Sequence, residues 1–471
     1  MREFWLRAGL FIACLSFVLV GACGGESSKG PDARLIAGGG AGDGAIDEVL
    51  HVHVINGLAG TPITGASVRV GLSSDAAPLV GTTDTAGLAS FKDGKLKGPQ
   101  TVTVTATGFA AATWVGANAA NLTIPLEATQ TAPPETAKSS GTIQGWDTRP
   151  APADGHLLLA YVGYSFIEPF DAPDNSIVQD NITVIGLTLP ANICYKATLG
   201  TNTESKCEWQ LKTRIGRQAL WAVMIDVDTK KTVDRADDTY SVVDYAFLLD
   251  QEAAAGHTYT SLSLVAVGAN GMTDATVAFQ AAPTGMASVA GLPMIKMGDL
   301  GNIVLIFSPF GPGKLTQKVP ALSGVLTTGT YDFLAMAKAS DTAAYPQSTI
   351  WKHGVALGGT VDFGAWQAPP TALAATSGTY SFTPVAQASL HTVKLYQSGT
   401  SGTTVAWNIG LLDGSTSFTL PSLSPNPLPV GTITMRVDAL KVGAFDPADF
   451  SVDVLAPDAT AHSADVLGFT R

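Results

Sequence analysis

Short runs of alternating apolar and polar residues, separated by turn residues, recur along most of the chain. In one of them Leu50, Val52 and Val54 alternate with less apolar neighbours. A period of two residues places alternate side chains on opposite faces of a β-strand. The chain also contains 50 glycines and 27 prolines among its 471 residues, a composition that suits many tight turns and few long helices. The sequence therefore predicts an all-β fold of tandem β-sandwich modules.

The first residues of the chain have the three zones of an export signal. Residues 1–22 begin with two arginines, continue with an apolar run at 8–20 and end in the small residues Gly21 and Ala22. The apolar run is about 13 residues long, which is shorter than the roughly 20 residues of a membrane-spanning helix. We therefore expect residues 1–22 to be a signal peptide that is removed.

Cys23 directly follows this segment. The tetrapeptide 20–23, Val-Gly-Ala-Cys, resembles the lipobox of bacterial lipoproteins. The resemblance implies that signal peptidase II cuts before Cys23 and that the sulfur of Cys23 carries lipid, so that the membrane is reached through this anchor. An ordinary signal peptide with an incidental cysteine is the alternative. Gly24 in place of aspartate favours the bacterial outer membrane or cell surface, and the periplasmic face stays open.

The net charge of the chain limits the classes of partner that it can bind. The formal charge is −12, and it becomes −13 once residues 1–22 are removed, because these carry two arginines and one glutamate. Nucleic-acid-binding domains have basic surfaces, and proteins held on anionic lipid have polybasic segments. We therefore expect no nucleic-acid partner. Envelope proteins or polysaccharide are the partners that fit an exported protein.

Composition divides the N-terminal part of the chain into segments. Residues 23–47 are rich in glycine and lack apolar periodicity, which predicts a flexible tether. Strand-like runs then predict a β-sandwich at 48–128. Residues 129–140 are rich in threonine, alanine and proline and are expected to be a linker.

The rest of the chain is divided in the same way. Residues 141–372 hold eight or more strand-like runs and predict one or two larger sandwiches, although 246–255 alone also fits a short helix. Residues 373–471 have strands at roughly ten-residue spacing. This last part loosely resembles a fibronectin type III or immunoglobulin-like module, with Trp407 expected in its core.

Three motifs within 48–128 carry a further resemblance. They are Thr-Pro-Ile-Thr-Gly-Ala-Ser-Val at 61–68, Thr-Asp-Thr-Ala-Gly at 83–87 and Val-Thr-Val-Thr-Ala-Thr-Gly-Phe at 102–109. In this order they resemble the carboxypeptidase regulatory-like domain, a small transthyretin-like sandwich. That family is a structural module attached to many secreted enzymes and surface proteins, so the resemblance implies a fold and no catalysis.

Two cysteines remain if the signal is removed and Cys23 carries lipid. Cys194 and Cys207 are separated by 12 residues. In an oxidising compartment this spacing predicts a local disulfide that closes a hairpin or a loop. Two free thiols, or half of a metal site, are the alternatives.

The sequence is poor in recognisable catalytic and metal-binding motifs. The sequence lacks a Gly-x-Ser-x-Gly elbow, a Ser-x-x-Lys pair, a His-Glu-x-x-His helix and a phosphate-binding loop. His51 and His53 share one face of a strand, which suits either the start of a metal site or two half-buried histidines. We predict no catalytic residues, no metal and no cofactor.

An acidic cluster and two tryptophans are the remaining candidates for ligand binding. The acidic residues suit either a solvated loop or a calcium site; they are Asp226, Asp228, Asp234, Asp237 and Asp238. Trp114 and Trp146 are the best candidates for exposed aromatic side chains that stack on sugars, although most aromatic residues of sandwiches lie in the core.

These observations favour one function and leave two alternatives. The chain is expected to be a lipid-anchored envelope or surface protein without enzymatic activity, in a scaffold, adhesion or binding role. The first alternative is an extracellular carbohydrate-binding lipoprotein. The second is a hydrolase with its site in residues 141–372. Fold alone does not separate them, because sandwiches host all three functions.

Overall fold

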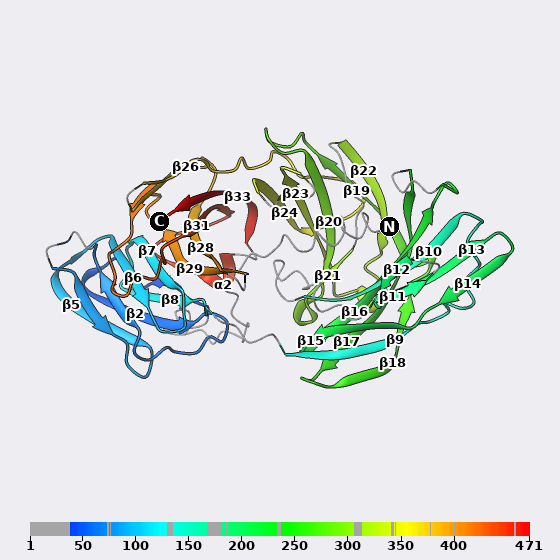
Figure 1. Ribbon diagram of the computed structural model, residues 1–471, viewed down its shortest axis with the longest axis horizontal. Helices are drawn as coiled ribbons and strands as arrows, with labels where there is room; N and C mark the ends of the chain where they lie inside the picture. Colours follow the sequence, from blue (N-terminus) through cyan, green and yellow to red (C-terminus); the bar gives the residue numbers. More distant parts are fainter. Residues whose placement is uncertain are drawn as a thin grey trace.

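β-Strands account for nearly all regular structure in the computed structural model (Figure 1), which confirms the prediction of an all-β fold of tandem β-sandwiches. The structure describes residues 38–72, 75, 77–129, 135–166, 181–184, 187–232, 237–305, 313–340, 343, 345–376, 378–399, 402–455 and 458–471. Within these residues no helix has the length and apolar character needed to cross a bilayer. The predicted signal peptide at 1–22 and Cys23 lie outside the described residues.

Helices among the described residues are short. The described ones are three single turns and one helix of four residues, namely η3 (Ala269–Gly271), η4 (Gly298–Leu300), η5 (Gly324–Leu326) and α2 (Val452–Leu455).

The largest sheet has twelve strands drawn from three parts of the chain. In spatial order they are β21 (Asn302–Val304), β20 (Ser288–Lys296), β23 (Thr330–Lys338), β24 (Gln347–Val355), β33 (Ala459–Thr470), β31 (Thr432–Val442), β28 (Leu390–Gly399), β29 (Gly402–Leu411), β7 (Ala111–Ala117), β6 (Gln100–Thr105), β3 (Ser67–Val70) and β4 (Leu79–Thr82). Two ladders join the parts: β24 pairs antiparallel with β33, and β29 pairs in parallel with β7. In Figure 1 the blue N-terminal strands accordingly lie beside the orange and red C-terminal strands.

Three smaller sheets pack on different parts of the twelve-stranded sheet. The first is β32 (Phe450–Ser451), β1 (Gly40–Gly42), β8 (Asn121–Leu126), β2 (Asp47–Asn56) and β5 (Leu88–Lys97). The second is β22 (Gly313–Pro320), β19 (Met272–Phe279) and β25 (Thr360–Asp362), and the third is β26 (Thr371–Thr376), β27 (Thr379–Thr383) and β30 (Ser417–Thr419). Three sandwiches therefore share one long sheet.

Apolar side chains fill the space between these layers. Leu50, Val52 and Val54 of β2 are fully buried against β3, β6 and β7, as their alternation predicts. On the opposite face of the long sheet, β27 and β30 pack on β28, β29 and β31 around Trp407, which is 1% exposed. Trp407 is therefore a core residue, as the sequence predicts.

The middle of the chain forms an eight-stranded sheet with an apolar core on each face. In spatial order its strands are β14 (Asn202–Lys206), β13 (Ile193–Leu199), β10 (His156–Tyr164), β16 (Gly216–Asp228), β17 (Thr239–Ala253), β18 (Thr258–Ala266), β9 (Thr136–Ile143) and β15 (Trp209–Arg214). A separate hairpin consists of β11 (Asn181–Val184) and β12 (Leu187–Pro190). The helix considered at 246–255 is wrong, because β17 occupies most of that range and Ala246 and Phe247 pair with β16.

The predicted tether at 23–47 ends in ordered structure, which corrects its C-terminal limit. Strand β1 pairs with β8 on one side and with β32 on the other. Gly40 has a φ of +150°, and a Cβ atom there would lie 2.1 Å from the carbonyl oxygen of Phe450. The glycines at this point thus permit close backbone approach, whereas their composition suggested flexibility.

The predicted linker at 129–140 also needs correction, because β9 begins inside it. This strand lies between β15, to which it is antiparallel, and β18, to which it is parallel. Its Ala137 and Ser139 are buried, so the small residues that suggested a linker pack closely against neighbouring strands. The other predicted domain limits remain predictions. The twelve-stranded sheet contains strands from both sides of the limits near 128 and 372.

Candidate functional site

His51 and His53 lie on one face of β2, as predicted, and both are half-buried. The Nδ1 atom of His51 is 2.8 Å from Oγ of Ser90 on the neighbouring strand β5. Among the described residues, no three histidine, cysteine or acidic side chains are grouped so that they could hold a metal ion. The two histidines are therefore half-buried residues of a strand.

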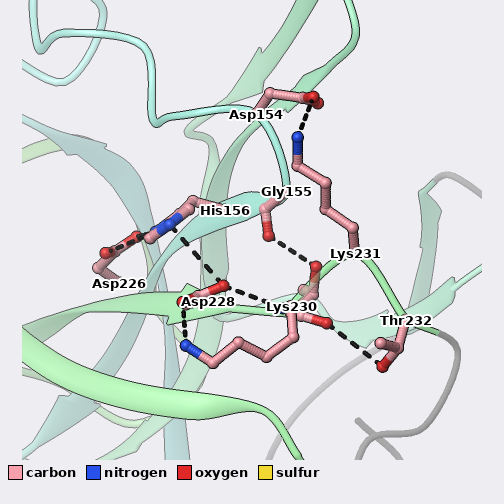
Figure 2. A network of polar contacts seen from close by, with 9 residues as sticks. Asp154, Gly155, His156, Asp226, Asp228, Lys230, Lys231 and Thr232 are labelled. Atoms are coloured by element: carbon pink, nitrogen blue, oxygen red, sulfur yellow. Dashed lines mark hydrogen bonds and ion pairs between the residues drawn. The ribbon is translucent and has the colours of Figure 1, made fainter.

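The acidic cluster lies at the end of β16 and is engaged with basic side chains (Figure 2). His156 places Nδ1 2.9 Å from Oδ2 of Asp226 and Nε2 3.8 Å from Oδ1 of Asp228. Lys230 forms an ion pair with Asp228 and lowers the pKa of that carboxyl. These carboxylates thus contact basic side chains of the chain itself.

The remaining acidic residues of this cluster have different positions. Thr232 donates a hydrogen bond from Oγ1 to Oδ1 of Asp237 at 2.9 Å, and the hydroxyl of Tyr240 lies 3.4 Å from Oδ2 of Asp238. Asp234 lies outside the described residues. The described acidic residues therefore lie at the end of β16 and in the loop after it, where each makes a hydrogen bond or an ion pair within the chain.

The two tryptophans predicted to be exposed are buried. Trp114 lies in β7 and is 9% exposed, and Trp146 is 2% exposed. Trp146 also donates from Nε1 to Oγ of Ser205 at 3.2 Å. The prediction of exposed stacking platforms at these residues is wrong, because both rings belong to apolar cores.

Cys194 and Cys207 form the predicted disulfide, with Cα atoms 4.3 Å apart. Cys194 lies in β13, and Cys207 follows β14, with which β13 pairs. Because Tyr195 pairs with Lys206, the two cysteines occupy the next position of the same ladder. The bridge thus closes a β-hairpin.

A buried group of charges is the feature that the sequence did not reveal. It lies on one face of β28, β29 and β31, with a contribution from β33, while the other face of β28, β29 and β31 carries the apolar core around Trp407. Its titratable members on these strands are almost fully buried; they are Lys394, Arg436, Asp438 and His462. We call these residues, with Glu127 and Asn408, the buried polar cluster.

One half of the buried polar cluster is a closed ion pair. Arg436 donates from Nε to Oδ2 of Asp438 at 2.8 Å, and Nε2 of His462 lies 3.0 Å from Oδ1 of the same carboxylate. Burial raises the pKa of Asp438, but Arg436 and His462 outweigh this effect and lower it. Burial lowers the pKa of His462, so a neutral imidazole is favoured. This half is a structural pair whose charges are already balanced.

In the other half of the buried polar cluster, an amine and a carboxamide contact the same carboxylate oxygen atom. Lys394 of β28 and Asn408 of β29 are direct cross-strand partners. The Nζ atom of Lys394 is 3.2 Å from Oε2 of Glu127, and Nδ2 of Asn408 is 3.3 Å from the same oxygen. An amine, a carboxamide and a carboxylate thus meet in a largely water-excluded place.

Backbone contacts hold Glu127 at this position. It follows β8, and its carbonyl oxygen accepts a hydrogen bond from the N–H of Ala110 at 2.8 Å. Ala110 precedes β7, in which Ala112 is the register partner of Asn408. The N-terminal and C-terminal sandwiches therefore assemble this site only when β7 and β29 pair.

A pocket of about 120 Å³ adjoins the site. Lys394 and Asn408 line it together with apolar side chains from β7, β28 and α2, among them Trp114 and Leu455. Such surroundings make a charge costly and favour neutral forms of the groups that face the pocket.

Alternation in the sequence hid this site. In β28 the polar Lys394 lies between the apolar Val393 and Leu395, a pattern typical of a strand with one solvated face. A weak signal was present in β31, where Arg436 and Asp438 are two residues apart and thus share a face. Opposite charges on one face of a strand can form an ion pair and be buried together.

Comparisons with known proteins assign no family. No protein-family model matches the chain, and no curated protein matches its sequence. Among solved structures, the Bacillus anthracis TIE protein has 10% identity and a TM-score of 0.15, with 68% of this chain and 50% of that chain covered. The chain thus spans half the length of the TIE protein.

Two pilins from other bacteria have similar values. The full-length major pilin SpaD from Corynebacterium diphtheriae has 10% identity and a TM-score of 0.15, with 62% of this chain and 87% of that chain covered. The shaft pilin SpaA from Lactobacillus rhamnosus GG has 11% identity and a TM-score of 0.14, with 47% and 97% covered. Likeness at this level assigns no function.

Proposed function

We propose that this chain is a non-enzymatic, lipid-anchored scaffold or adhesion protein of a bacterial outer membrane or cell surface. The observation that carries the proposal is the twelve-stranded sheet, in which β7 pairs with β29 and β24 pairs with β33. Main-chain hydrogen bonds therefore connect modules that are distant in sequence. A protein so connected suits the transmission of force or the holding of partners at a fixed spacing.

Lipid attachment at Cys23 would place this scaffold on the membrane. The support is the tetrapeptide 20–23 after an apolar run at 8–20. We further propose that residues 48–128 are a carboxypeptidase regulatory-like module, supported by the turn at 83–87. In that turn Asp84 accepts hydrogen bonds from the N–H groups of Ala86 and Leu88 at its Oδ1 atom.

The two alternatives lack a supporting observation in the described residues. A carbohydrate-binding role needs exposed aromatic side chains, whereas Trp114 and Trp146 are buried. A glycoside hydrolase in 141–372 needs converging carboxylates with free oxygens. In that range the carboxylates of Asp226, Asp228 and Asp244 are all engaged with basic side chains.

Fractionation of cells tests the anchor. The Cys23→Ala protein is expected to keep an uncut signal peptide and, because it carries no lipid, to leave the outer-membrane fraction, whereas Cys14→Ala, within the same signal, is the matched control and is expected to behave like the wild type. Membrane attachment of Cys23→Ala with normal processing would overturn the lipid anchor.

Binding and activity panels test the scaffold role. The full-length protein, extracted in detergent, is applied to a glycan array and to a panel of generic glycosidase, esterase and peptidase substrates. We expect no saturable glycan signal and no turnover above that of heat-denatured protein. Saturable binding would favour the carbohydrate alternative, and turnover would favour the hydrolase; either result overturns the non-enzymatic scaffold.

A further inference from the structure

We propose that the side chains of Lys394 and Asn408 join in a covalent amide bond, with Glu127 as the catalytic residue. The bond would cross-link β28 to β29 within the C-terminal sandwich, at the face on which the N-terminal sandwich docks. It is a modification of the chain by itself, and it goes beyond the proposed scaffold function.

The first requirement is that the two reacting groups be close and fixed. Lys394 and Asn408 are register partners on adjacent antiparallel strands, and Cβ atoms of such partners lie about 4.5–5.5 Å apart. A lysine side chain spans that distance easily. Both groups contact one oxygen of Glu127, at 3.2 Å and 3.3 Å, so their ends are held together. Proximity of this kind replaces an encounter between free groups.

The second requirement is a lysine that can act as a nucleophile. An ammonium group has no lone pair, so the neutral amine must be accessible near neutral pH. Lys394 is 9% exposed, and burial lowers its pKa; Glu127 opposes this effect, and Arg436 adds to it. Asp438 also raises the pKa of Lys394, but more weakly than Arg436 lowers it.

The third requirement is a path for the proton. Attack by Nζ on Cγ of Asn408 forms a carbon–nitrogen bond, and the Cγ–Nδ2 bond then breaks. One proton must leave Nζ and one must reach Nδ2, so that ammonia departs. Oε2 of Glu127 contacts both nitrogen atoms, and a single carboxyl can therefore accept the first proton and deliver the second.

The reaction balances without any further reactant. One amine and one carboxamide give one secondary amide and one ammonia, no atom is oxidised or reduced, and Glu127 is regenerated. The adjoining pocket of about 120 Å³ gives the ammonia a place to leave. Oδ1 of Asn408 is buried and has no hydrogen-bond partner among the described residues.

Mass spectrometry of the purified full-length protein tests the bond. Trypsin cuts after lysine and arginine, and Lys394 is the only such residue between Lys352 and Arg436. After denaturation and digestion, a linked protein yields residues 353–436 as one fragment, lighter than its sequence by one ammonia. Tandem fragmentation is expected to place the link between 394 and 408. Cleavage after Lys394, with two fragments of unmodified mass, overturns the proposal.

Variants separate the roles of the three residues. Lys394→Arg and Asn408→Ala are expected to lose the ammonia deficit, and trypsin is expected to cut after position 394 in both. Glu127→Gln, which keeps the shape of the side chain, is expected to form the link roughly a hundredfold more slowly, as for loss of a general acid–base group. The exposed Lys441→Arg is the matched control and retains the link.

Two outcomes would overturn parts of the proposal even if the wild type is linked. A link formed at the wild-type rate in Glu127→Gln excludes Glu127 as the proton carrier. An ammonia deficit that persists in Asn408→Ala places the modification at another carboxamide. The digestion is done on denatured protein, so a variant that folds poorly shows directly whether its chain was linked.

Discussion

His353 of β24 contacts both β23 and β33 through its two ring nitrogens. Nδ1 lies 2.9 Å from Oδ2 of Asp332, which belongs to the neighbouring strand β23, and Nε2 lies 3.0 Å from the carbonyl oxygen of Ala459 at the start of β33. Both partners are acceptors. A neutral imidazole has one N–H group, so only the charged ring can donate to both.

The stability of the protein is therefore expected to depend on pH through His353. Its hydrogen bond with Asp332 raises the pKa of His353 in the folded state, although burial opposes this. The stabilising contribution is complete below the pKa of the unfolded chain, about 6.5, and it is lost as the pH rises through the higher folded-state pKa. Urea midpoints measured from pH 6 upward are expected to fall more for the wild type than for His353→Gln.

The exposed His257 supplies the control for this prediction. The urea midpoints of His257→Gln are expected to follow the wild type at each pH. If the curves of wild type and His353→Gln run parallel above pH 6, His353 does not carry the pH dependence.

Removal of the disulfide is expected to weaken the hairpin of β13 and β14. A bridge that closes a loop of this length contributes about 3 kcal/mol in the chain-entropy model, and Cys194 and Cys207 are 13 positions apart. The double variant Cys194→Ser/Cys207→Ser should show this loss in denaturant titrations. Dithiothreitol should destabilise the wild type similarly and leave the double variant unchanged; equal midpoints for both proteins without reductant would contradict the prediction.

Much of the fold could be read from local alternation. The runs around Leu50 and Trp407 form strands in which these side chains are buried, because a period of two residues directly encodes a half-buried strand. The tether and linker limits failed where small residues pack closely, as at Gly40 and Ala137. Composition alone cannot distinguish a flexible glycine from one that permits close backbone contact.

The candidate site could not be predicted from local alternation, because its residues are distant in the sequence. Glu127 and Asn408 are 281 positions apart, and they meet because β29 pairs in parallel with β7. No local pattern encodes this pairing. Lys394 also suggested a solvated face, since nothing in its own strand reveals that the N-terminal sandwich covers it.

Replacement of Trp146 is expected to affect stability and not ligand binding. The ring is 2% exposed, and truncation of a buried tryptophan to alanine costs about 3–5 kcal/mol. Trp146→Ala should therefore lower the denaturation midpoint strongly, whereas Trp366→Ala, which removes a half-buried ring, should cost less. A glycan-array difference between wild type and folded Trp146→Ala, at unchanged stability, would restore the role of a sugar platform.

Breaking the pair of Arg436 and Asp438 is expected to be the most damaging single change of charge. Asp438→Ala leaves the guanidinium of Arg436, which is 3% exposed, without its buried counter-charge, and such a loss costs about 3–5 kcal/mol. The matched control is Asp274→Ala, because Asp274 and Lys318 form an exposed pair at 2.9 Å that is worth less than about 1 kcal/mol. Both variants are compared with the wild type by urea denaturation at one pH. Similar losses for the two would show that burial of the first pair carries no energetic weight, because the two pairs differ chiefly in their exposure to water.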